Sequence, residues 1–194
     1  MTLETPGFYT RSFDGVAVTI LYMGPMVQIL IICTGNTCRS PMAEAILRSL
    51  LPKEMAGVTR VISAGSGAAD GIPASSLAVQ VCAECGIDVS GLRSARLTPA
   101  MIRASDLVLG LEPHHVEYAR GLAPEVADRI HLITEKGATV GVAPVSEGVL
   151  DPMGGSADQY RDTFNRIRSH LLGWIPVIRE LVERREGVRR SSES

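Results

Sequence analysis

The stretch Cys33-Thr34-Gly35-Asn36-Thr37-Cys38-Arg39-Ser40-Pro41-Met42-Ala43-Glu44 decides the fold of this chain. It follows an apolar run at 27–32 that predicts a buried strand, and it leads into apolar residues at helical spacing over 43–51. A strand, a short polar loop and a helix N-terminus together aim backbone N–H groups and the positive end of the helix dipole at one point. The sequence therefore predicts an anion-binding loop at 33–40.

The residue types in this loop indicate phosphoryl transfer to a cysteine. A thiol near a helix N-terminus and a guanidinium loses its proton readily, and the thiolate of Cys33 would be a strong nucleophile. Arg39 offers a planar fork of donors that matches two oxygens of a phosphoryl group. Gly35 permits the backbone angles that a tight anion nest requires, and Ser40 can donate a hydrogen bond to the thiolate. These parts predict an enzyme that forms a phosphocysteine.

The stretch from Cys33 to Glu44 resembles the low-molecular-weight protein tyrosine phosphatase family, whose signature is Cys, five residues, Arg and Ser. The resemblance implies that Cys33 and Arg39 are catalytic. It also implies that the other loop residues bind the phosphate of the substrate: Thr34, Gly35, Asn36, Thr37, Cys38 and Ser40. A buried cysteine at a strand end beside a solvated arginine is the alternative, but it does not account for the whole string.

Beyond the loop, the chain reads as alternating strands and helices. Strands are expected at 58–63, 106–111 and 129–134, and helices at 73–84 and 158–183, with Ser156 as the N-cap of the last helix and a kink at Pro176. This alternation predicts βαβ units and hence a parallel sheet with helices on both faces. The resemblance agrees, because it implies a three-layer α/β fold with four parallel strands. We expect the phosphatase domain to span 26–184.

Composition limits the partners. The chain has 194 residues, of which 45% are hydrophobic and 21% charged, and a formal charge of -2. These values are typical of a globular domain and give no sign of nucleic-acid or membrane binding. A phosphorylated protein is the expected partner of a monomer, without a metal or another cofactor. Because a nucleophilic thiol needs a reducing compartment, the cytoplasm is the expected location.

The two ends of the chain lie outside the predicted phosphatase domain. The run from Val16 to Cys33 is apolar enough for a membrane span, but Gly24-Pro25 and Gln28 interrupt it, and no small-residue cleavage pattern follows. We therefore expect 1–25 to be an extension, either flexible or adding an edge strand over 15–22. The tail 185–194 is charged and rich in serine, which predicts disorder.

Phosphoryl transfer also needs an acid for the leaving group and a base for water, and one loop carboxylate can serve as both. A late Asp-Pro pair has this role in the family, which makes Asp151, in Asp151-Pro152 after a long loop at 135–150, the candidate general acid. A simple Asp-Pro turn is the alternative. His114 and His115 follow the third strand and are expected to be exposed loop residues rather than part of the rim of the site.

The four cysteines are too few and too unevenly placed for a disulfide scaffold. Cys82 and Cys85 have the spacing of a metal or dithiol pair, but no further ligand pair lies nearby. The preferred interpretation is therefore that they pack in the core. We expect oxidation to join Cys33 to Cys38 reversibly, with simple structural packing of Cys38 as the alternative.

Thr37 bears on the substrate. Tyrosine-specific members resemble one another in carrying a bulky aliphatic residue at this position, and aromatic residues after their Asp-Pro pair. Here Thr37 and Met153-Gly154-Gly155-Ser156 stand instead, and aromatic residues are only 4% of the chain. Over 26–184 the sequence looks like the bacterial protein arginine phosphatase branch, which implies hydrolysis of phosphoarginine. A threonine hydroxyl also suits a guanidinium better than an apolar wall does.

Three alternatives stay open at this point. A tyrosine phosphatase is the first. An arsenate reductase of the same fold would need relay cysteines after the third strand, where Glu112-Pro113-His114-His115 has none. An inactive phospho-binding module would be expected to lack Cys33 or Asp151, and both are present.

Overall fold

The computed structural model describes residues 7–13, 16–22, 26–136 and 147–192. Its centre is a four-stranded sheet of β3 (Val27–Cys33), β4 (Thr59–Gly65), β5 (Leu107–Gly110) and β6 (Ile130–Leu132). The strands are all parallel and run in the order β4-β3-β5-β6. The predicted α/β class, with four parallel strands, is confirmed.

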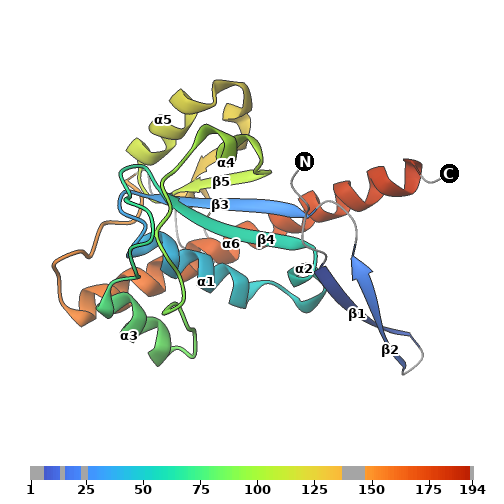
Figure 1. The fold of residues 1–194 in the computed structure, drawn as a ribbon, viewed down its shortest axis with the longest axis horizontal. Helices are drawn as coiled ribbons and strands as arrows, with labels where there is room; N and C mark the ends of the chain where they lie inside the picture. Colours follow the sequence, from blue (N-terminus) through green and yellow to red (C-terminus); the bar gives the residue numbers. More distant parts are fainter. Residues whose placement is uncertain (1–6, 14–15, 23–25, 137–146, 193–194) are drawn as a thin grey trace.

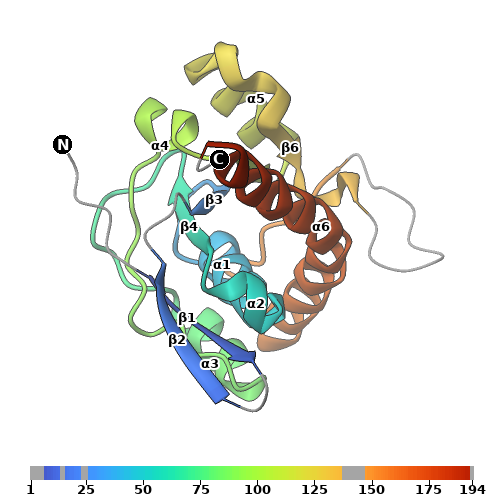
Figure 2. The same cartoon turned by 90° about the vertical axis from the view of Figure 1, so that its right-hand side faces the viewer.

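Helices cover both faces of this sheet (Figures 1 and 2). Helices α1 (Arg39–Leu50), α3 (Ser76–Glu84) and α6 (Ala157–Ser192) lie on one face, and α4 (Pro99–Arg103) and α5 (Pro113–Leu122) lie on the other. The alternation of side chains along β3 divides the core accordingly. Ile29 and Ile31 pack with α1 and α6, whereas Leu30 and Ile32 pack with α5. Because both faces of β3 are buried, the strand is continuously apolar.

Strand β3 is the place where the chain reverses its direction of winding. The connection through α1 leads to β4 on one side of β3, and the later connection leads to β5 on the other side. In such sheets the loops diverge at the carboxyl end of the central strand and leave a crevice there. Cys33 is the last residue of β3, so it stands at that crevice.

Gly65 lets the neighbouring strand approach this point closely. It is paired with Cys33 in register, and a Cβ atom there would come 2.5 Å from the Thr34 carbonyl oxygen and 2.7 Å from Ala68 Cβ. Those separations are far inside van der Waals contact. The absence of a side chain at 65 therefore permits the compact path of the loop that begins at Cys33.

Several short elements were not predicted from the sequence. These are α2 (Lys53–Ala56), α4, the 3-10 helices η1 (Pro124–Arg129) and η2 (Ile133–Glu135), and the extent of α5. The expected strands and helices are otherwise present with shifted ends, and Ser156 caps α6 as expected: the Gln159 N–H donates to its hydroxyl oxygen at 3.4 Å. Most of the long loop expected at 135–150 lies outside the described residues.

The two ends of the chain differ from expectation. Strand β2 (Val16–Tyr22) does form, but it pairs with β1 (Gly7–Phe13) in a separate antiparallel hairpin rather than at the edge of the main sheet. Helix α6 runs on to Ser192, through most of the tail for which we expected disorder. Arg185, the first residue of that tail, anchors the helix to the sheet end, because its guanidinium donates to the Met26 carbonyl at 2.8 Å and to the Asp106 carboxylate at 2.5 Å.

Pro176 lies within α6, and the helix changes direction along its length (Figure 2). No helix in the described part of the chain combines the length and the apolar composition that crossing a bilayer would require.

Candidate active site

The loop at 33–40 is closed around the Cys33 sulfur. Asn36 takes a left-handed backbone conformation, with φ of 52°. This turn directs its backbone N–H to the Cys33 Sγ at 3.2 Å. Left-handed backbone is tolerated by asparagine more readily than by most residues, because its short amide can bond locally. The loop thus directs a backbone hydrogen-bond donor at the Cys33 sulfur.

Ser40 is held so that its hydroxyl faces the same sulfur. Its Oγ lies 2.9 Å from Cys33 Sγ and accepts a hydrogen bond from Asn36 Nδ2 at 2.8 Å. Since the serine oxygen is already an acceptor from Asn36, its own proton is available to Cys33. The Asn36 amide is fixed in turn by Ser63, at 2.9 Å from Nδ2, and by the Ala95 N–H, at 2.8 Å from Oδ1.

Arg39 is buried in the same crevice and carries two carboxylate partners. Its Nη1 bonds to Glu112 and, at 2.9 Å, to the Val149 carbonyl, and its Nη2 lies 2.6 Å from the Asp151 carboxylate. The Nε–H has no partner in the described part of the chain, although it is fully buried. A buried donor without a partner is costly, so this N–H is an open position for an acceptor such as a phosphoryl oxygen.

Asp151 reaches the site because the segment before it lies against the end of β5. Gly148 has φ of 78°, and a Cβ there would overlap the backbone of Leu111 and Glu112. Val149 N–H donates to the Leu111 carbonyl at 2.7 Å. The Asp151 side chain is 41% exposed, so its carboxylate lies at the open side of the crevice, beside buried Arg39.

The remaining loop residues line the outer part of the crevice. Thr34 and Gly35 are exposed and Thr37 is half-buried. The Thr37 carbonyl accepts from the Ser75 N–H at 2.7 Å, which ties the loop to the start of α3. Its hydroxyl lies over Gly35 and makes no hydrogen bond with the residues that the structure describes. That hydroxyl is therefore available to a bound molecule.

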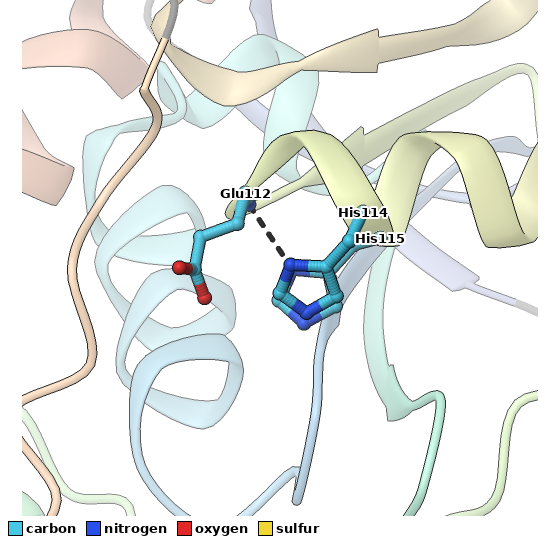
Figure 3. Close-up of side chains that lie close together, drawn as sticks. All are labelled: Glu112, His114 and His115. Carbon is cyan, nitrogen blue, oxygen red and sulfur yellow. Dashed lines mark hydrogen bonds between the residues drawn. The ribbon is translucent and has the colours of Figure 1, made fainter.

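His115 is buried, which makes our expectation of an exposed loop histidine wrong. The Glu112 N–H donates to His115 Nδ1 at 3.0 Å (Figure 3), so the ring proton sits on Nε2, which lies 3.0 Å from Thr34 Oγ1. Burial, with smaller contributions from His114 and Arg39, lowers the pKa of His115 to about 3. The ring is therefore neutral at physiological pH and ties α5 to the loop.

Glu112, His114 and His115 lie close enough together to suggest a metal site (Figure 3). Two of the three residues are already engaged, because the Glu112 carboxylate holds Arg39 and both ring nitrogens of His115 are hydrogen-bonded. A metal would have to displace one hydrogen bond of His115 and compete with Arg39 for Glu112, so the donor set does not favour a metal.

The other cysteines divide between core and surface. Burial raises the pKa of the Cys38 thiol to about 12, although a hydrogen bond with Tyr160 opposes the rise. Cys82 is packed in the core as expected, whereas Cys85 is exposed at the end of α3. Neither belongs to a group of potential metal ligands in the described chain.

Sequence reasoning missed Glu112 and the true position of His115. Pro113 was a usable signal, because proline directly after a strand is favoured in the first turn of a helix. A helix beginning there places Glu112 and His115 at the carboxyl end of β5, beside Cys33 rather than in a surface loop.

Comparisons with known proteins agree with this geometry. The model of the family described as low molecular weight phosphotyrosine protein phosphatase matches residues 28–186. The probable low molecular weight protein-tyrosine-phosphatase EpsP of Ralstonia nicotianae is 34% identical over 79% of this chain and 97% of its own length. The protein-arginine-phosphatase of Bacillus subtilis is also 34% identical, over 75% of this chain and 92% of its own length.

A solved low molecular weight protein tyrosine phosphatase from T. tengcongensis superimposes with a TM-score of 0.68 at 36% identity. The match covers 77% of this chain and 98% of that one. Sequence and fold thus agree over nearly the whole length of each relative. The chain belongs to the low molecular weight phosphotyrosine protein phosphatase family and is a cysteine-dependent protein phosphatase.

Proposed function

We propose that this protein hydrolyses phosphoarginine in proteins through a phosphocysteine on Cys33, with Asp151 as general acid and base. One observation carries the proposal. Ser40, which bonds to the Cys33 sulfur, directly follows Arg39 in the loop, and the buried Arg39 guanidinium, with its open Nε–H, bonds to the half-exposed Asp151 carboxylate. Cys33, Arg39 and Asp151 are the nucleophile, the phosphate clamp and the proton donor that the reaction requires.

In the first step the phosphoryl oxygens bind the loop N–H groups and Arg39, and displace the Asp151 carboxylate from Arg39 Nη2. The Cys33 thiolate attacks phosphorus and forms the S–P bond while the P–N bond to the substrate breaks. Once displaced, the Asp151 carboxylate takes up a proton from solvent, and it gives that proton to the departing guanidine nitrogen. In the second step water attacks phosphorus, Asp151 takes the proton of that water, and the S–P bond breaks to release phosphate and the thiolate.

Thr37 favours the arginine substrate over the tyrosine one. Its half-buried hydroxyl has no hydrogen bond within the described residues, so it can accept one from a guanidinium N–H. The Asp151 carboxyl group offers a second polar partner to the guanidinium. A phenol ring would need an apolar wall, and the residues after Pro152 supply one methionine and two glycines.

A tyrosine phosphatase is the second candidate, and EpsP, with the same 34% identity as the arginine phosphatase, favours it. The discriminating experiment measures phosphate release from two peptides of one sequence, carrying phosphoarginine or phosphotyrosine at the same position. We expect the larger kcat/KM for phosphoarginine. A larger value for phosphotyrosine would replace our proposal with the second candidate.

The exchange Thr37→Ile is expected to shift selectivity toward phosphotyrosine. Isoleucine removes the hydroxyl and adds apolar volume, so a guanidinium loses a partner while a phenyl ring gains a contact. Loss of one buried polar contact costs roughly 1–3 kcal/mol, or about one to two decades in the ratio of the two kcat/KM values. Thr37→Ser, which keeps the hydroxyl, is the control and should preserve the ratio. An unchanged ratio in Thr37→Ile would exclude Thr37 as the selectivity residue.

Peroxide is expected to inactivate the enzyme reversibly by way of a Cys33–Cys38 disulfide. The peroxide oxidises Cys33 to a sulfenic acid, and Cys38 displaces water from it. Because the pKa of Cys38 is about 12, its thiolate fraction and hence disulfide formation should rise about tenfold per pH unit below that value. Activity is measured after a thiol reductant is added. If Cys38→Ala recovers as completely as wild type, Cys38 has no protective role.

The proposed function extends to the substrate, the oligomeric state and the location of the enzyme. The family implies a phosphorylated protein as substrate, and we propose that a monomer acts on it in the cytoplasm, where the thiol of Cys33 stays reduced.

A further inference from the structure

Glu44 is a buried carboxylate that the proposed chemistry does not use. It lies on α1 with only 5% of its surface exposed. Its Oε2 accepts from the Ser63 hydroxyl at 2.5 Å, and its Oε1 lies 2.5 Å from Arg48 Nη2, one helical turn further along. A buried carboxylate that is retained in a core normally has a structural or functional task.

Hydrogen bonds connect this carboxylate to the nucleophile without a gap. Ser63 Oγ accepts from Asn36 Nδ2 at 2.9 Å, and the same amide donates to Ser40 Oγ at 2.8 Å. Ser40 Oγ lies 2.9 Å from Cys33 Sγ. The orientation of each group depends on the next, because Ser63 can accept from Asn36 in this geometry only while its own proton points to Glu44.

We propose that Arg48, which lies outside the active site, is a positioning residue for the nucleophile: by holding Glu44 ionised it fixes Ser63, Asn36 and Ser40 against Cys33. The inference rests on the proposed function of Cys33. Arg48 is suited to this role because its guanidinium also donates to the Val61 carbonyl at 2.7 Å, which holds it in place although its side chain is 51% exposed.

The charge on Glu44 needs this support. Burial raises the pKa of Glu44 above its usual value, and the hydrogen bonds from Ser63 and the charge of Arg48 oppose the rise. Arg48 is the one charged residue of the described chain that acts on this carboxylate, since Arg60 on β4 alternates to the opposite face from Val61 and Ser63. Without Arg48 the carboxylate would take up a proton at higher pH than in wild type, and Ser63 would then face a weaker, neutral acceptor that can also act as a donor.

The test is the pH profile of kcat/KM, with one phosphorylated substrate for all variants. In Arg48→Met the acidic limb should move to higher pH by about one unit, which is about a tenfold loss of rate on that limb. Arg48→Lys restores the charge and should restore the wild-type limb. Combining Arg48→Met with Glu44→Gln should abolish the displacement, because a glutamine does not titrate there.

Thermal unfolding shows whether each variant is folded, and Arg48→Gln replaces Arg48→Met if that variant is not. An acidic limb that coincides with wild type in the uncharged variant would overturn the inference. The inference would also be overturned if the double variant showed the same displacement of the acidic limb, because Glu44 could then not be the group that causes it. If wild type itself does not turn over, or turns over without Cys33, the proposed function fails instead.

Discussion

Replacing Cys33 by serine is expected to abolish turnover while inorganic phosphate still binds. A serine hydroxyl forms no anion at neutral pH, so the attack on phosphorus should slow by a factor on the order of 10⁴ or more. The loop N–H groups and the Arg39 guanidinium stay in place, so the dissociation constant of phosphate should change by only about a few-fold.

Two measurements check this expectation, namely single-turnover phosphate release and calorimetric phosphate binding. Cys85→Ser is the matched control, because Cys85 is an exposed cysteine at the end of α3. It should retain wild-type activity and phosphate binding. Turnover close to wild type in Cys33→Ser would exclude the phosphocysteine mechanism.

Asp151→Asn is expected to lower kcat by about 10²–10⁴. The amide is almost the same size as the carboxylate but cannot give a proton to the leaving nitrogen or take one from water. It also removes a negative charge from Arg39 Nη2, at 2.6 Å, so phosphate should bind at least as tightly as in wild type. A loss of kcat without a loss of phosphate affinity therefore identifies a chemical rather than a binding role.

The leaving group gives a further check on Asp151. An aryl phosphate with a very acidic phenol needs little protonation, so Asp151→Asn should slow its phosphorylation step much less than that of phosphoarginine. Asp128→Asn, at an exposed aspartate in η1, serves as control and should leave both substrates unaffected. Equal losses for the two substrates would argue against Asp151 as the acid.

The anion loop and the parallel sheet were predictable because their determinants are local. The apolar run of β3, the polar loop and the start of α1 are continuous in sequence, so the residue types in this one stretch predict them. The Asp-Pro pair could be connected to the loop only through the family resemblance. Nothing in the spacing itself shows that Asp151 and Arg39 meet across 112 positions.

The contacts that support the site were not predictable either, because they join residues that lie far apart in the sequence. Glu112 reaches Arg39 across 73 positions and His115 reaches Thr34 across 81, and both contacts depend on β5 lying beside β3. Composition also misled at the C-terminus, where charge and serine content predict disorder. The ion pair of Arg185 with Asp106, which joins α6 to the sheet end, depends on the fold rather than on composition.

The most direct test of the account is to trap the intermediate. The enzyme is mixed with a phosphoarginine peptide and quenched in acid, and the phosphorylated residue is located by mass spectrometry. With an aryl phosphate of a very acidic phenol, whose phosphorylation step is slowed little, Asp151→Asn should increase the trapped amount, since it lacks the base that activates water for the second step. The account predicts a phosphoryl group on Cys33 that forms no more slowly than phosphate is released. Phosphate release at the full rate with no phosphoryl group on Cys33, or with one on another residue, would contradict it.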